Sequence, residues 1–491
     1  MRDRRPKPVL WLCAVVSLLA AGLLVYSQTA AFAWDEGFHL LAAQLIKSGR
    51  RPYLDFCFPQ TPLNAYWNAA WMAVFGESWR TAHAVAALAT AGAIFLTADF
   101  LLARFPVPAW RFACALGAAL TVGLNQLVPY FGTVGQAYGL CLFLIVAAFR
   151  LSIVSVERNS LIVPAVAGFL AAAAAESSLL TAPVGPVLLL WILIHNRAGA
   201  RIAKLAAFLA GSAIALQPLF WLFVKSPRQV LFSVLQYNLR YRQVAWSSAI
   251  RHDLELMASW IDSSQALLLG LLAIAGLLFI TFRSEWDRPR KAEFYLCAWL
   301  ALALWAQISS AHPHFPQYFI LVVPFLGVLA SVGLYSVASR MYHPDRPFLP
   351  ILVYGVLLSL GLAKSLYDER DDFTWADVEE IARKVDQVTP PNAPLYADES
   401  VYFVTRRRPP SGMELRDSHK LELPAPLAEE MHIVNGSELD RRIKAGIFST
   451  VETCTFPEEK IEALGLSKLY SNHAEFDECS VFWGKLLRAD R

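Results

Sequence analysis

Two adjacent carboxylic acids, Asp35 and Glu36, follow the first long apolar segment of the chain, in the sequence WDEGFHLLAAQLIKSG. At the boundary between membrane and water, an acidic group has access both to a lipid headgroup and to a hydroxyl in solution. A carboxylate there takes up the hydroxyl proton while a phosphate departs, which is general base catalysis. The competing interpretation is structural, because aspartate is also a preferred residue at the amino-terminal cap of a helix.

The same loop contains further polar candidates for contact with a substrate. Asp55, Gln60 and Tyr66 lie in PYLDFCFPQTPLNAYWNAAW. The alternative for Asp55 is that it only closes a turn. Tyr66 belongs to an apolar, aromatic segment at 62–75, and aromatic residues of this kind are typical of the membrane–water interface.

Cations that suit a phosphodiester stand in a second polar stretch, 225–260. Arg240 and Arg242 flank Tyr241, and a guanidinium binds a phosphodiester with two hydrogen bonds where an ammonium offers a point charge. The alternative is a surface helix whose arginines extend into anionic lipid.

Three sites lie within or beside apolar segments. Glu176 is costly at membrane depth and is expected to face a cavity or a partner, either an acceptor or an arginine from 240–251. We expect Asp99 to form an ion pair with Arg104. His312 and His314 stand two residues apart, but no cysteine or acid in their turn completes a metal site.

No metal or cofactor is therefore predicted. The sequence has no glycine-rich loop that opens a helix after a strand and would cradle phosphates, which argues against a nucleotide-sugar or ATP site.

The composition requires a membrane. Hydrophobic residues make up 56% of the 491 residues and charged residues only 17%, and the mean hydropathy is +0.42. A soluble protein cannot bury so much apolar surface, so the chain is predicted to be a polytopic α-helical membrane protein.

Charge divides the chain into two parts. Residues 368–491 hold 25 acidic and 16 basic residues, whereas residues 1–367 hold 15 acidic and 27 basic ones. We therefore predict a transmembrane domain at 1–367, with external amphipathic loops at 34–80 and 225–260, and a soluble extracytoplasmic domain at 368–491. The overall charge of +3 gives no indication of nucleic-acid binding.

Eleven apolar segments are long enough, or nearly so, to cross a bilayer core of about 30 Å. They are 9–33, 81–103, 110–128, 134–151, 161–175, 178–195, 202–224, 263–282, 293–311, 316–339 and 348–366. The stretch 161–194 is read as two helices with a bend at Glu176–Ser178. Basic residues in the short loops then place the N-terminus in the cytoplasm and the C-terminal domain outside the inner membrane.

The elements that position these residues follow from periodicity and caps. We expect a helix from Asp35 to a stop at Gly49, with its apolar stripe on the outer leaflet. In the C-terminal domain we expect helices at 373–388, 437–445 and 457–464 and strands at 395–397, 433–434 and 450–451. Cys454 and Cys479 are either a disulfide or two buried thiols.

The motifs in this chain resemble polytopic glycosyltransferases of the GT-C fold. The resemblance rests on Asp-Glu-Gly after the first span, a helix that ends in glycine, Pro-Tyr-x-Asp-Phe, Pro-Leu-x-x-Tyr-x-x-Ala and HFPQYFILVVPFLGVLA at 314–330. It covers most of residues 9–340. The bacterial branch that uses polyprenyl-phosphate sugars is the most similar, with its protein O-mannosyltransferases, lipid A aminoarabinose transferases and galacturonosyltransferase-type envelope enzymes.

The resemblance implies roles for individual residues. Asp35 matches the catalytic aspartate of the first loop, and Glu36 matches its acidic neighbour. His312, His314 and Tyr318 are implied to line the donor cavity.

Two departures from the family pattern stand beside these matches. Gln60–Leu63 (QTPL) stands where aminoarabinose transferases carry Lys-Pro-Pro-Leu, so the lysine that contacts the donor phosphate is absent. The segment 125–138 lacks the acid that metal-dependent relatives place there.

The resulting prediction is an inverting glycosyltransferase that moves a sugar from a polyprenyl-phosphate donor to an envelope glycan, lipid or protein. It acts among membrane lipids, at the outer face of the membrane. The first alternative is a transporter or flippase for lipid-linked sugars, although the chain shows no internal repeat between its halves. The second is a non-catalytic membrane scaffold for the outer domain.

Overall fold

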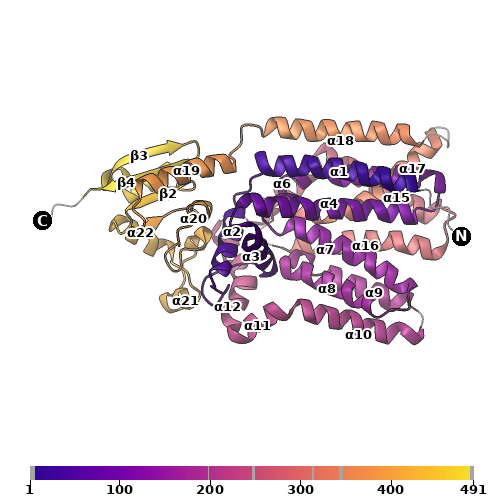
Figure 1. Ribbon diagram of the computed structural model, residues 1–491, viewed down its shortest axis with the longest axis horizontal. Helices are drawn as coiled ribbons and strands as arrows, with labels where there is room; N and C mark the ends of the chain where they lie inside the picture. The colour runs from indigo at the N-terminus through magenta and orange to yellow at the C-terminus, as the bar shows by residue number, and fades with distance from the viewer. Residues whose placement is uncertain (1–5, 197, 246–248, 312–313, 342–346, 487–491) are drawn as a thin grey trace. The chain divides into compact units, whose positions relative to one another are not determined.

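The computed structural model describes residues 6–196, 198–245, 249–311, 314–341 and 347–486, which form two compact units (Figure 1). The first, here called the helical unit, comprises Met1–Ala31, His83–Leu219 and Ile250–Asp372. The second, here called the mixed unit, comprises Phe32–Ala82, Phe220–Ala249 and Phe373–Arg491. The units are described one at a time. The predicted domain boundary at 367/368 stays a prediction.

The helical unit is built from α-helices that run side by side in Figure 1. They are α1 (Pro6–Thr29), α4 (Trp79–Arg104), α5 (Arg111–Gly123), α6 (Leu127–Gly132), α7 (Tyr138–Glu157), α8 (Ile162–Ser177), α9 (Val184–His195), α10 (Ala198–Ala215), α14 (Ala249–Asp262), α15 (Ser264–Phe282), α16 (Arg288–Ser310), α17 (Val323–Met341) and α18 (Phe348–Asp368), with short 3₁₀ turns η1 (Pro108–Trp110), η2 (Leu179–Thr181) and η4 (Pro316–Val322). Helix α11 (Gln217–Lys225) begins in this unit, and its residues from Phe220 onward belong to the mixed unit.

Among the described residues, seven helices are long and apolar enough to span a membrane, which makes this a multi-pass membrane protein. An eighth candidate is the pair Gly199–Ala215 and Gln217–Lys225, which bends by 55°. Two shorter apolar helices occupy Ile162–Ser177 and Leu179–His195. A helix lies in each of the eleven predicted segments, while the number that cross the bilayer stays a prediction.

The expected break in the long apolar stretch is present. Helix α8 ends at Ser177, and Ser178 has an extended backbone with φ −156° and ψ 125°. The turn η2 follows, and α9 begins after Pro183. Proline lacks the backbone N–H that a continuous helix needs, so it starts the new helix instead of prolonging the old one.

Small residues bring helices of this unit into backbone contact. A Cβ atom added to Gly211 of α10 would lie 1.8 Å from the carbonyl oxygen of Ala165 in α8. A Cβ atom on Gly276 of α15 would lie 2.1 Å from the carbonyl oxygen of Leu329 in α17. Glycine is therefore required at both positions. Close packing of this kind is a main source of helix association in lipid.

The ion pair predicted between Asp99 and Arg104 is wrong. Arg150 of α7 forms the ion pair with Asp99, and Arg104 pairs with Glu157 and also lies 3.4 Å from Glu293. Asp99 therefore pairs with an arginine of a neighbouring helix and not with Arg104, five residues further along its own chain segment. Tertiary packing brings the charges of different helices together at one end of the unit.

The mixed unit combines short helices with a small sheet. Its helices are α2 (Glu36–Lys47), α3 (Leu63–Phe75), α12 (Pro227–Leu231), α13 (Tyr237–Ala245), α19 (Trp375–Val388), α20 (Glu399–Thr405), α21 (Ala425–Glu430), α22 (Gly436–Lys444), α23 (Glu458–Leu464) and α24 (Leu466–Leu469), with a π-helical turn η3 (Phe232–Gln236) and a 3₁₀ turn η5 (Arg416–Lys420). Its strands are β1 (Leu395–Tyr396), β2 (Thr450–Thr453), β3 (Tyr470–Phe476) and β4 (Cys479–Lys485).

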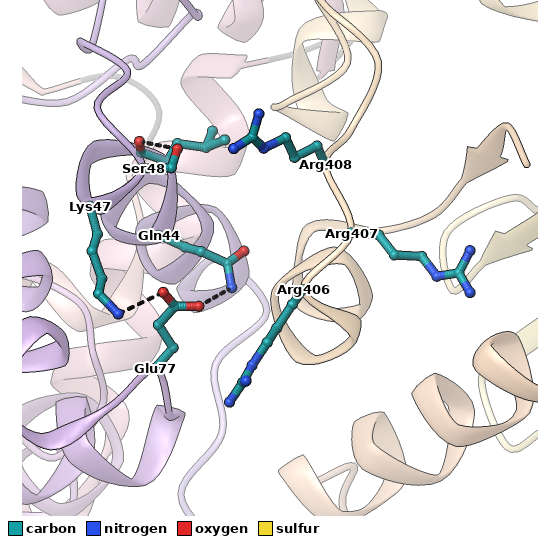
Figure 2. Close-up of a pocket in the computed structure, with 8 residues that line it drawn as sticks. Gln44, Lys47, Ser48, Glu77, Arg406, Arg407 and Arg408 are labelled. Carbon is teal, nitrogen blue, oxygen red and sulfur yellow. Dashed lines mark hydrogen bonds and ion pairs between the residues drawn. The ribbon is translucent and has the colours of Figure 1, made fainter. Parts of the chain in front are cut away.

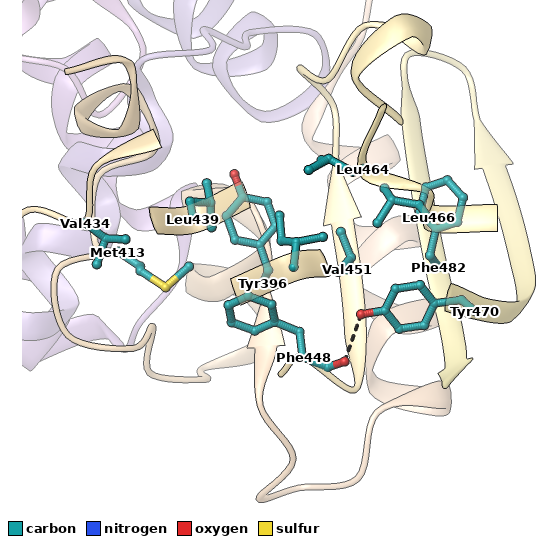
Figure 3. Close-up of a cluster of buried hydrophobic side chains, with 11 residues drawn as sticks. Tyr396, Met413, Val434, Leu439, Phe448, Val451, Leu464, Leu466, Tyr470 and Phe482 are labelled. Carbon is teal, nitrogen blue, oxygen red and sulfur yellow. Dashed lines mark hydrogen bonds between the residues drawn. The ribbon is translucent and has the colours of Figure 1, made fainter. Parts of the chain in front are cut away.

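The sheet has the order β1-β2-β4-β3. Strand β1 pairs with β2 in parallel, and the other two pairings are antiparallel. Successive side chains face opposite sides of the sheet. Phe482 accordingly enters the hydrophobic core shown in Figure 3, whereas the ring of Trp483 lies 4.4 Å from the ammonium of Lys384 in α19. In that core, the hydroxyl of Tyr470 donates a 2.8 Å hydrogen bond to the carbonyl oxygen of Phe448.

The secondary structure of the C-terminal region differs from the prediction in two places. The strand predicted at Ile433-Val434 is absent: the N–H of Val434 bonds to the carbonyl oxygen of Gly412, and both side chains are buried without a sheet ladder. The hairpin of β3 and β4 was missed, because its turn at Asp477 and Glu478 lacks the Asn-Gly or Asp-Gly pair that marks such turns. Asp477 nevertheless has a positive φ of 43°.

A second hydrophobic core in the mixed unit joins three chain segments that are far apart in sequence. Its buried members are Cys57, Phe232, Tyr237, Leu415, Leu421, Leu423, Ala428, Met431 and Ile433. The first loop, the stretch after α11 and the η5 region are thereby held together. This core fixes the position of η5 against α13, which matters for the charges described next.

Candidate active site

Asp35 stands immediately before α2 but does not cap it. Its backbone is already helical, with φ −74° and ψ −6°, and its side chain makes no capping hydrogen bond. Because a capping aspartate accepts a hydrogen bond from a backbone N–H of the first turn, the purely structural interpretation of this residue loses its main support. The stop at Gly49 has the expected positive φ of 92°.

The helix that follows is held by protein on its apolar side. Leu40, Leu41 and Leu45 of the expected lipid-facing stripe are at most 3% exposed. They pack within the mixed unit, where α2 contacts α3 and α20. The stripe is therefore a protein-packing face, and the carboxylate at its start is attached to a fixed element.

Charges from the C-terminal part of the chain surround Asp35. The pKa of Asp35 is raised to about 6, first by burial and then by the negative charge of Asp417, while Arg416 and Lys420 act in the opposite direction. Tyr241 of α13 also lies within electrostatic range of this carboxyl. A carboxyl group with a pKa near neutrality is suited to take up and release a proton.

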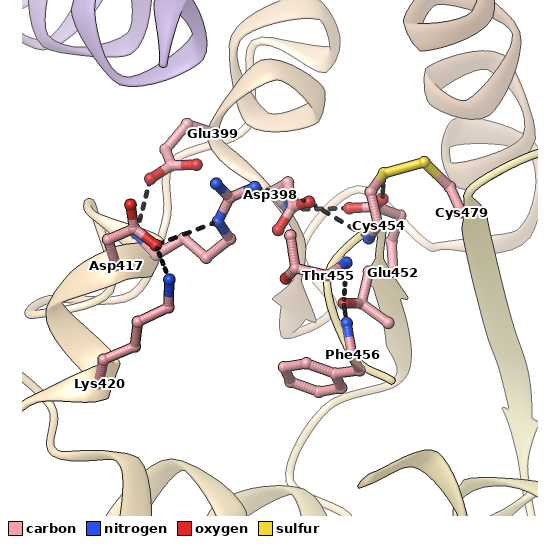
Figure 4. A network of polar contacts seen from close by, with 11 residues as sticks. Asp398, Glu399, Asp417, Lys420, Glu452, Cys454, Thr455, Phe456 and Cys479 are labelled. Atoms are coloured by element: carbon pink, nitrogen blue, oxygen red, sulfur yellow. Dashed lines mark hydrogen bonds and ion pairs between the residues drawn. A yellow bond between two sulfur atoms is a disulfide. The ribbon is translucent and has the colours of Figure 1, made fainter. Parts of the chain in front are cut away.

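Arg416 is the cation that the acids Asp398 and Asp417, labelled in Figure 4, both approach. Its backbone N–H donates a 2.6 Å hydrogen bond to Glu399, and its guanidinium lies 3.3 Å from Asp398. The same guanidinium lies 3.8 Å from Asp417. Burial raises the pKa of Glu399 to about 7, against the lowering effect of Arg416. Several acids thus share one nearly buried cation.

Lys420 links this cluster to the stretch between the helices α11 and α14. Its ammonium donates a 2.9 Å hydrogen bond to the hydroxyl of Tyr241 and lies 3.0 Å from Asp417. Half of its side chain is exposed. Lys420 is therefore a cation near Asp35 that is accessible to a ligand.

Glu36 has a different environment from Asp35. It is fully buried, and its carboxylate accepts a 3.0 Å hydrogen bond from the indole N–H of Trp375 in α19. Trp375 in turn stacks on Trp79, with ring centroids 5.5 Å apart. Glu36 therefore anchors the start of α2, and a direct catalytic role for it stays a prediction.

The other predicted residues of the first loop have local partners. Asp55 forms a 3.0 Å ion pair with Arg51, whose side-chain hydrogen bond lowers the pKa of Asp55. The backbone oxygen of Gln60 accepts a 2.5 Å hydrogen bond from the hydroxyl of Tyr53. Tyr66 is partly buried within α3. These contacts agree with the turn-closing alternative for Asp55 and leave its role towards a substrate as a prediction.

Of the two predicted phosphate-binding arginines, only one has a described side chain. Arg240 is exposed, and its guanidinium lies 5.9 Å from the ring centroid of Phe232. The side chain of Arg242, like the whole of His312, lies outside the described residues.

The remaining predicted residues belong to the helical unit. Glu176 is fully buried, and one of its oxygens accepts a 3.0 Å hydrogen bond from the N–H of Leu219. Arg251, one of its expected partners, pairs with Glu255 instead. His314 is buried, and its N–H bonds to Asp253 at 3.1 Å.

Tyr318 is also in the helical unit and is partly buried. Its ring lies near Tyr138 and Phe315. A role of Tyr318 towards a substrate stays a prediction, as it does for Glu176 and His314.

One close group of potential metal ligands occurs among the described residues: Glu452, Cys454 and Cys479. Both sulfurs of this group are joined in a disulfide. A disulfide offers no thiolate to a metal, so this group does not fit a metal ion. It settles the question of the two cysteines in favour of the disulfide.

The fold and the site together define a class of protein. It is a polytopic membrane protein with a small α/β region and, directly after its first apolar helix in the sequence, a carboxylate (Asp35) that does not cap the next helix. No family model and no curated protein matches the sequence. The fold is similar to two crystal structures of ArnT from Cupriavidus metallidurans, one in the apo state and one bound to undecaprenyl phosphate. Each has a TM-score of 0.69 and covers 96% of this chain and 97% of that chain.

The identities to these two structures are 16% and 15%, so the likeness is one of fold. Arabinosyltransferase EmbB from Mycobacterium smegmatis matches 70% of this chain and 32% of its own at 14% identity, with a TM-score of 0.49. The chain has the GT-C fold that its motifs predicted.

Sequence reasoning missed Arg416, Asp417 and Lys420. They stand about 380 residues after Asp35, in the tract RDSHK of the C-terminal domain, where the sequence analysis names no candidate site residue. The one available signal was the alternation of opposite charges in that tract, which is also common on solvated surfaces. Only the fold brings these charges to the first loop.

Proposed function

We propose that the protein is a membrane glycosyltransferase that transfers a sugar from a polyprenyl-phosphate donor to an acceptor of the cell envelope. The proposal rests on the environment of Asp35. This residue directly precedes α2 without capping it, its pKa is about 6, and Arg416 and Lys420 lie within electrostatic range. The likeness in fold to ArnT, one structure of which holds undecaprenyl phosphate, supports the same class of donor.

The proposed reaction is a direct displacement at the anomeric carbon. The acceptor hydroxyl gives its proton to Asp35, and its oxygen forms a new bond to that carbon. The bond from the anomeric carbon to the phosphate oxygen breaks, and its electron pair leaves with the polyprenyl phosphate. Attack opposite to the leaving group inverts the configuration of the sugar.

The departing phosphate needs a cation, and the expected lysine before the Pro-Leu of QTPL is missing. We assign this role to Lys420, whose side chain is half exposed and whose charge acts on Asp35. A cation placed where negative charge develops lowers the barrier of such a reaction. Arg240 and Arg242 are the further candidates for the donor phosphate.

The remaining predicted residues are proposed as substrate contacts. In the first loop these are Asp55, Gln60 and Tyr66; in the helical unit they are Glu176, His312, His314 and Tyr318. Glu36 is proposed as a positioning residue, because it ties the start of α2 to Trp375.

We further propose that the N-terminus is cytoplasmic and that the C-terminal region lies outside the inner membrane. The basic residues of the short loops support this orientation. The disulfide between Cys454 and Cys479 also supports it, since disulfides persist in oxidising compartments.

The test is Asp35→Asn in purified protein, with transfer from a polyprenyl-phosphate sugar to envelope acceptors as the measurement. Loss of a general base is expected to lower turnover by about 10²–10⁴-fold. Asp440→Asn, which removes a carboxylate from α22, is the matched control and should retain activity. Turnover near the wild-type level in Asp35→Asn would remove the proposal. In cells, the inactive variant should accumulate the lipid-linked donor.

A further inference from the structure

A basic pocket lies in the mixed unit at the end of α2 opposite to Asp35 (Figure 2). It has a volume of about 230 Å³. It is lined by Gln44, Leu45, Lys47, Ser48, Glu77 and the three consecutive arginines Arg406–Arg408. Four cations and one anion therefore surround a single small cavity. None of the residues proposed above for glycosyl transfer lines it.

Two hydrogen bonds fix the walls of this pocket. The amide of Gln44 in α2 donates to the carbonyl oxygen of Phe403 in α20 at 3.2 Å and to the carboxylate of Glu77 at 3.1 Å. The arginine loop follows α20 directly. The cavity is therefore held open between two packed helices and is not a chance gap at a loose surface.

The four cations do not have the same task. Lys47 is paired with Glu77 at 2.8 Å. Arg407 contacts Asp386 and donates to the backbone oxygens of Thr389 and Pro390, and in Figure 2 it points away from the cavity. These two cations are already neutralised by the protein.

Arg406 and Arg408 are exposed and have no ion pair within the described part of the chain. Figure 2 shows both on the side of the loop that faces α2 and Glu77. With Lys47 balanced by Glu77, the pocket carries a surplus of about two positive charges. In the same view the two guanidiniums diverge, Arg408 towards Ser48 and Arg406 past Glu77, whose carboxylate also feels the charge of Arg406. Each guanidinium can donate to an oxygen of an anion from its own edge of the pocket.

Arg406 and Arg408 are not needed to cap the carboxyl-terminal ends of the two helices beside the pocket. The last carbonyl oxygens of α2 accept hydrogen bonds from the N–H groups of Ser48, Gly49 and Arg50. In α20, the carbonyl oxygen of Phe403 accepts from Gln44 and from the N–H of Arg406. A role as side-chain caps for the negative helix ends is therefore filled by other donors.

The backbone at Arg406 is strained in a way that favours another residue. It has φ 56° and ψ 25°, the left-handed conformation at which helices usually end in glycine. A residue with a Cβ atom costs roughly 1 kcal/mol there. Arginine at this position lowers stability relative to glycine, which indicates that the guanidinium of Arg406 has a function that glycine cannot supply.

We infer that this pocket binds an oxyanion of the phosphate monoester class. The ligand is either free phosphate or the headgroup of an anionic lipid. Helix α2 has 12 residues, so the pocket lies about 18 Å from Asp35 along the helix axis. It is a second site, separate from the proposed transfer chemistry, and its occupancy does not require that Asp35 be a catalytic base.

The test uses the full-length protein in nanodiscs of phosphatidylcholine. One arm titrates inorganic phosphate by calorimetry, and the other counts bound phosphatidic acid by native mass spectrometry. In Arg406→Gln/Arg408→Gln we expect affinity in at least one arm to fall about tenfold or more, because two charge-assisted hydrogen bonds are lost. Arg383→Gln/Arg441→Gln removes two exposed arginines elsewhere in the mixed unit and should bind as the wild type does.

Arg406→Gly separates binding from folding. Glycine relieves the positive φ, so this variant should melt no lower than the wild type while it binds the anion more weakly. Asp35→Asn should bind normally, which distinguishes failure of this site from failure of the proposed function. Absence of wild-type binding in both arms, or equal affinity in the double variant and its control, would overturn the assignment.

Discussion

The indole N–H of Trp375 donates a hydrogen bond to the buried carboxylate of Glu36, 339 residues earlier in the chain. Through this bond the helix α19 fixes the first turn of α2, and thereby the position of Asp35. Trp79 stacks on Trp375 and donates its own N–H to Glu379 at 2.8 Å. Two tryptophans thus present the same chemistry to two carboxylates of different burial.

This difference predicts the result of a matched pair of variants. Trp375→Phe removes a donor from a fully buried carboxylate and should lower the free energy of unfolding by about 1–3 kcal/mol more than its loss of ring area alone. Trp79→Phe should cost less, since Glu379 is partly exposed and also pairs with Arg80 at 2.6 Å. Denaturant unfolding in one detergent compares them, and equal losses would contradict the anchoring role of Glu36.

The pH dependence of transfer should report the charges around Asp35. A base with a pKa of about 6 is protonated and inactive below that pH. Asp417→Asn removes a charge that raises this pKa, so the acidic limb of the kcat/KM profile should move to lower pH. Lys420→Gln removes a charge that lowers it, so the limb should move to higher pH. If the midpoints of the two variants move in the same direction, or do not move, then Asp417 and Lys420 do not control the protonation of Asp35.

Local patterns predicted the helices well because hydropathy is a property of neighbouring residues. The break after Ser177 and the stop at Gly49 follow from proline and glycine, whose backbone preferences act within a few residues. The ion pair of Asp99 with Arg150 did not follow from the sequence, since several basic residues were equally available.

Only those residues of the candidate site that lie in the first loop could be predicted from the sequence. Asp35 and Glu36 are recognisable beside the first span, but their partners Trp375 and Lys420 arrive from the other end of the chain. No periodicity or spacing carries information across such a separation. The sequence therefore gives no sign that charges of the outer region act on the pKa of Asp35, which burial raises first.

Arg416 should be essential for the stability of the mixed unit. Arg416→Met keeps the backbone N–H that bonds to Glu399 but removes the guanidinium charge from Asp398 and Glu399, both buried. Breaking a buried ion pair in this way costs about 3–5 kcal/mol. The loss should grow as the pH rises, because Glu399, whose pKa Arg416 lowers, must then ionise without this cation. Thermal melting at pH 5 and pH 8 measures this, with the exposed Arg441→Met as a control expected to change little. A pH-independent loss would contradict the explanation.

The disulfide of Cys454 and Cys479 provides a test of compartment as well as stability. It closes a loop with a sequence separation of 25, which corresponds to about 3.5 kcal/mol in the chain-entropy description. Cys454→Ser/Cys479→Ser should lose stability of that order, whereas Cys13→Ser, at an exposed free thiol, should not. In intact cells both sulfurs should react with a maleimide only after reduction. Labelling without reductant would contradict an oxidising location for this region.

The packing of α15 against α17 predicts opposite outcomes for two glycines of one helix. A Cβ atom at Gly276 would lie 2.1 Å from a backbone oxygen of α17, while nothing lies within 4 Å of one at Gly270. Gly276→Ala should force the helices apart at a cost of about 1–3 kcal/mol. Gly270→Ala should be neutral or stabilising by up to about 1 kcal/mol, because alanine is the better helix former. Melting temperatures in one detergent decide between them, and a Gly276→Ala variant as stable as Gly270→Ala would show that the two helices do not touch there.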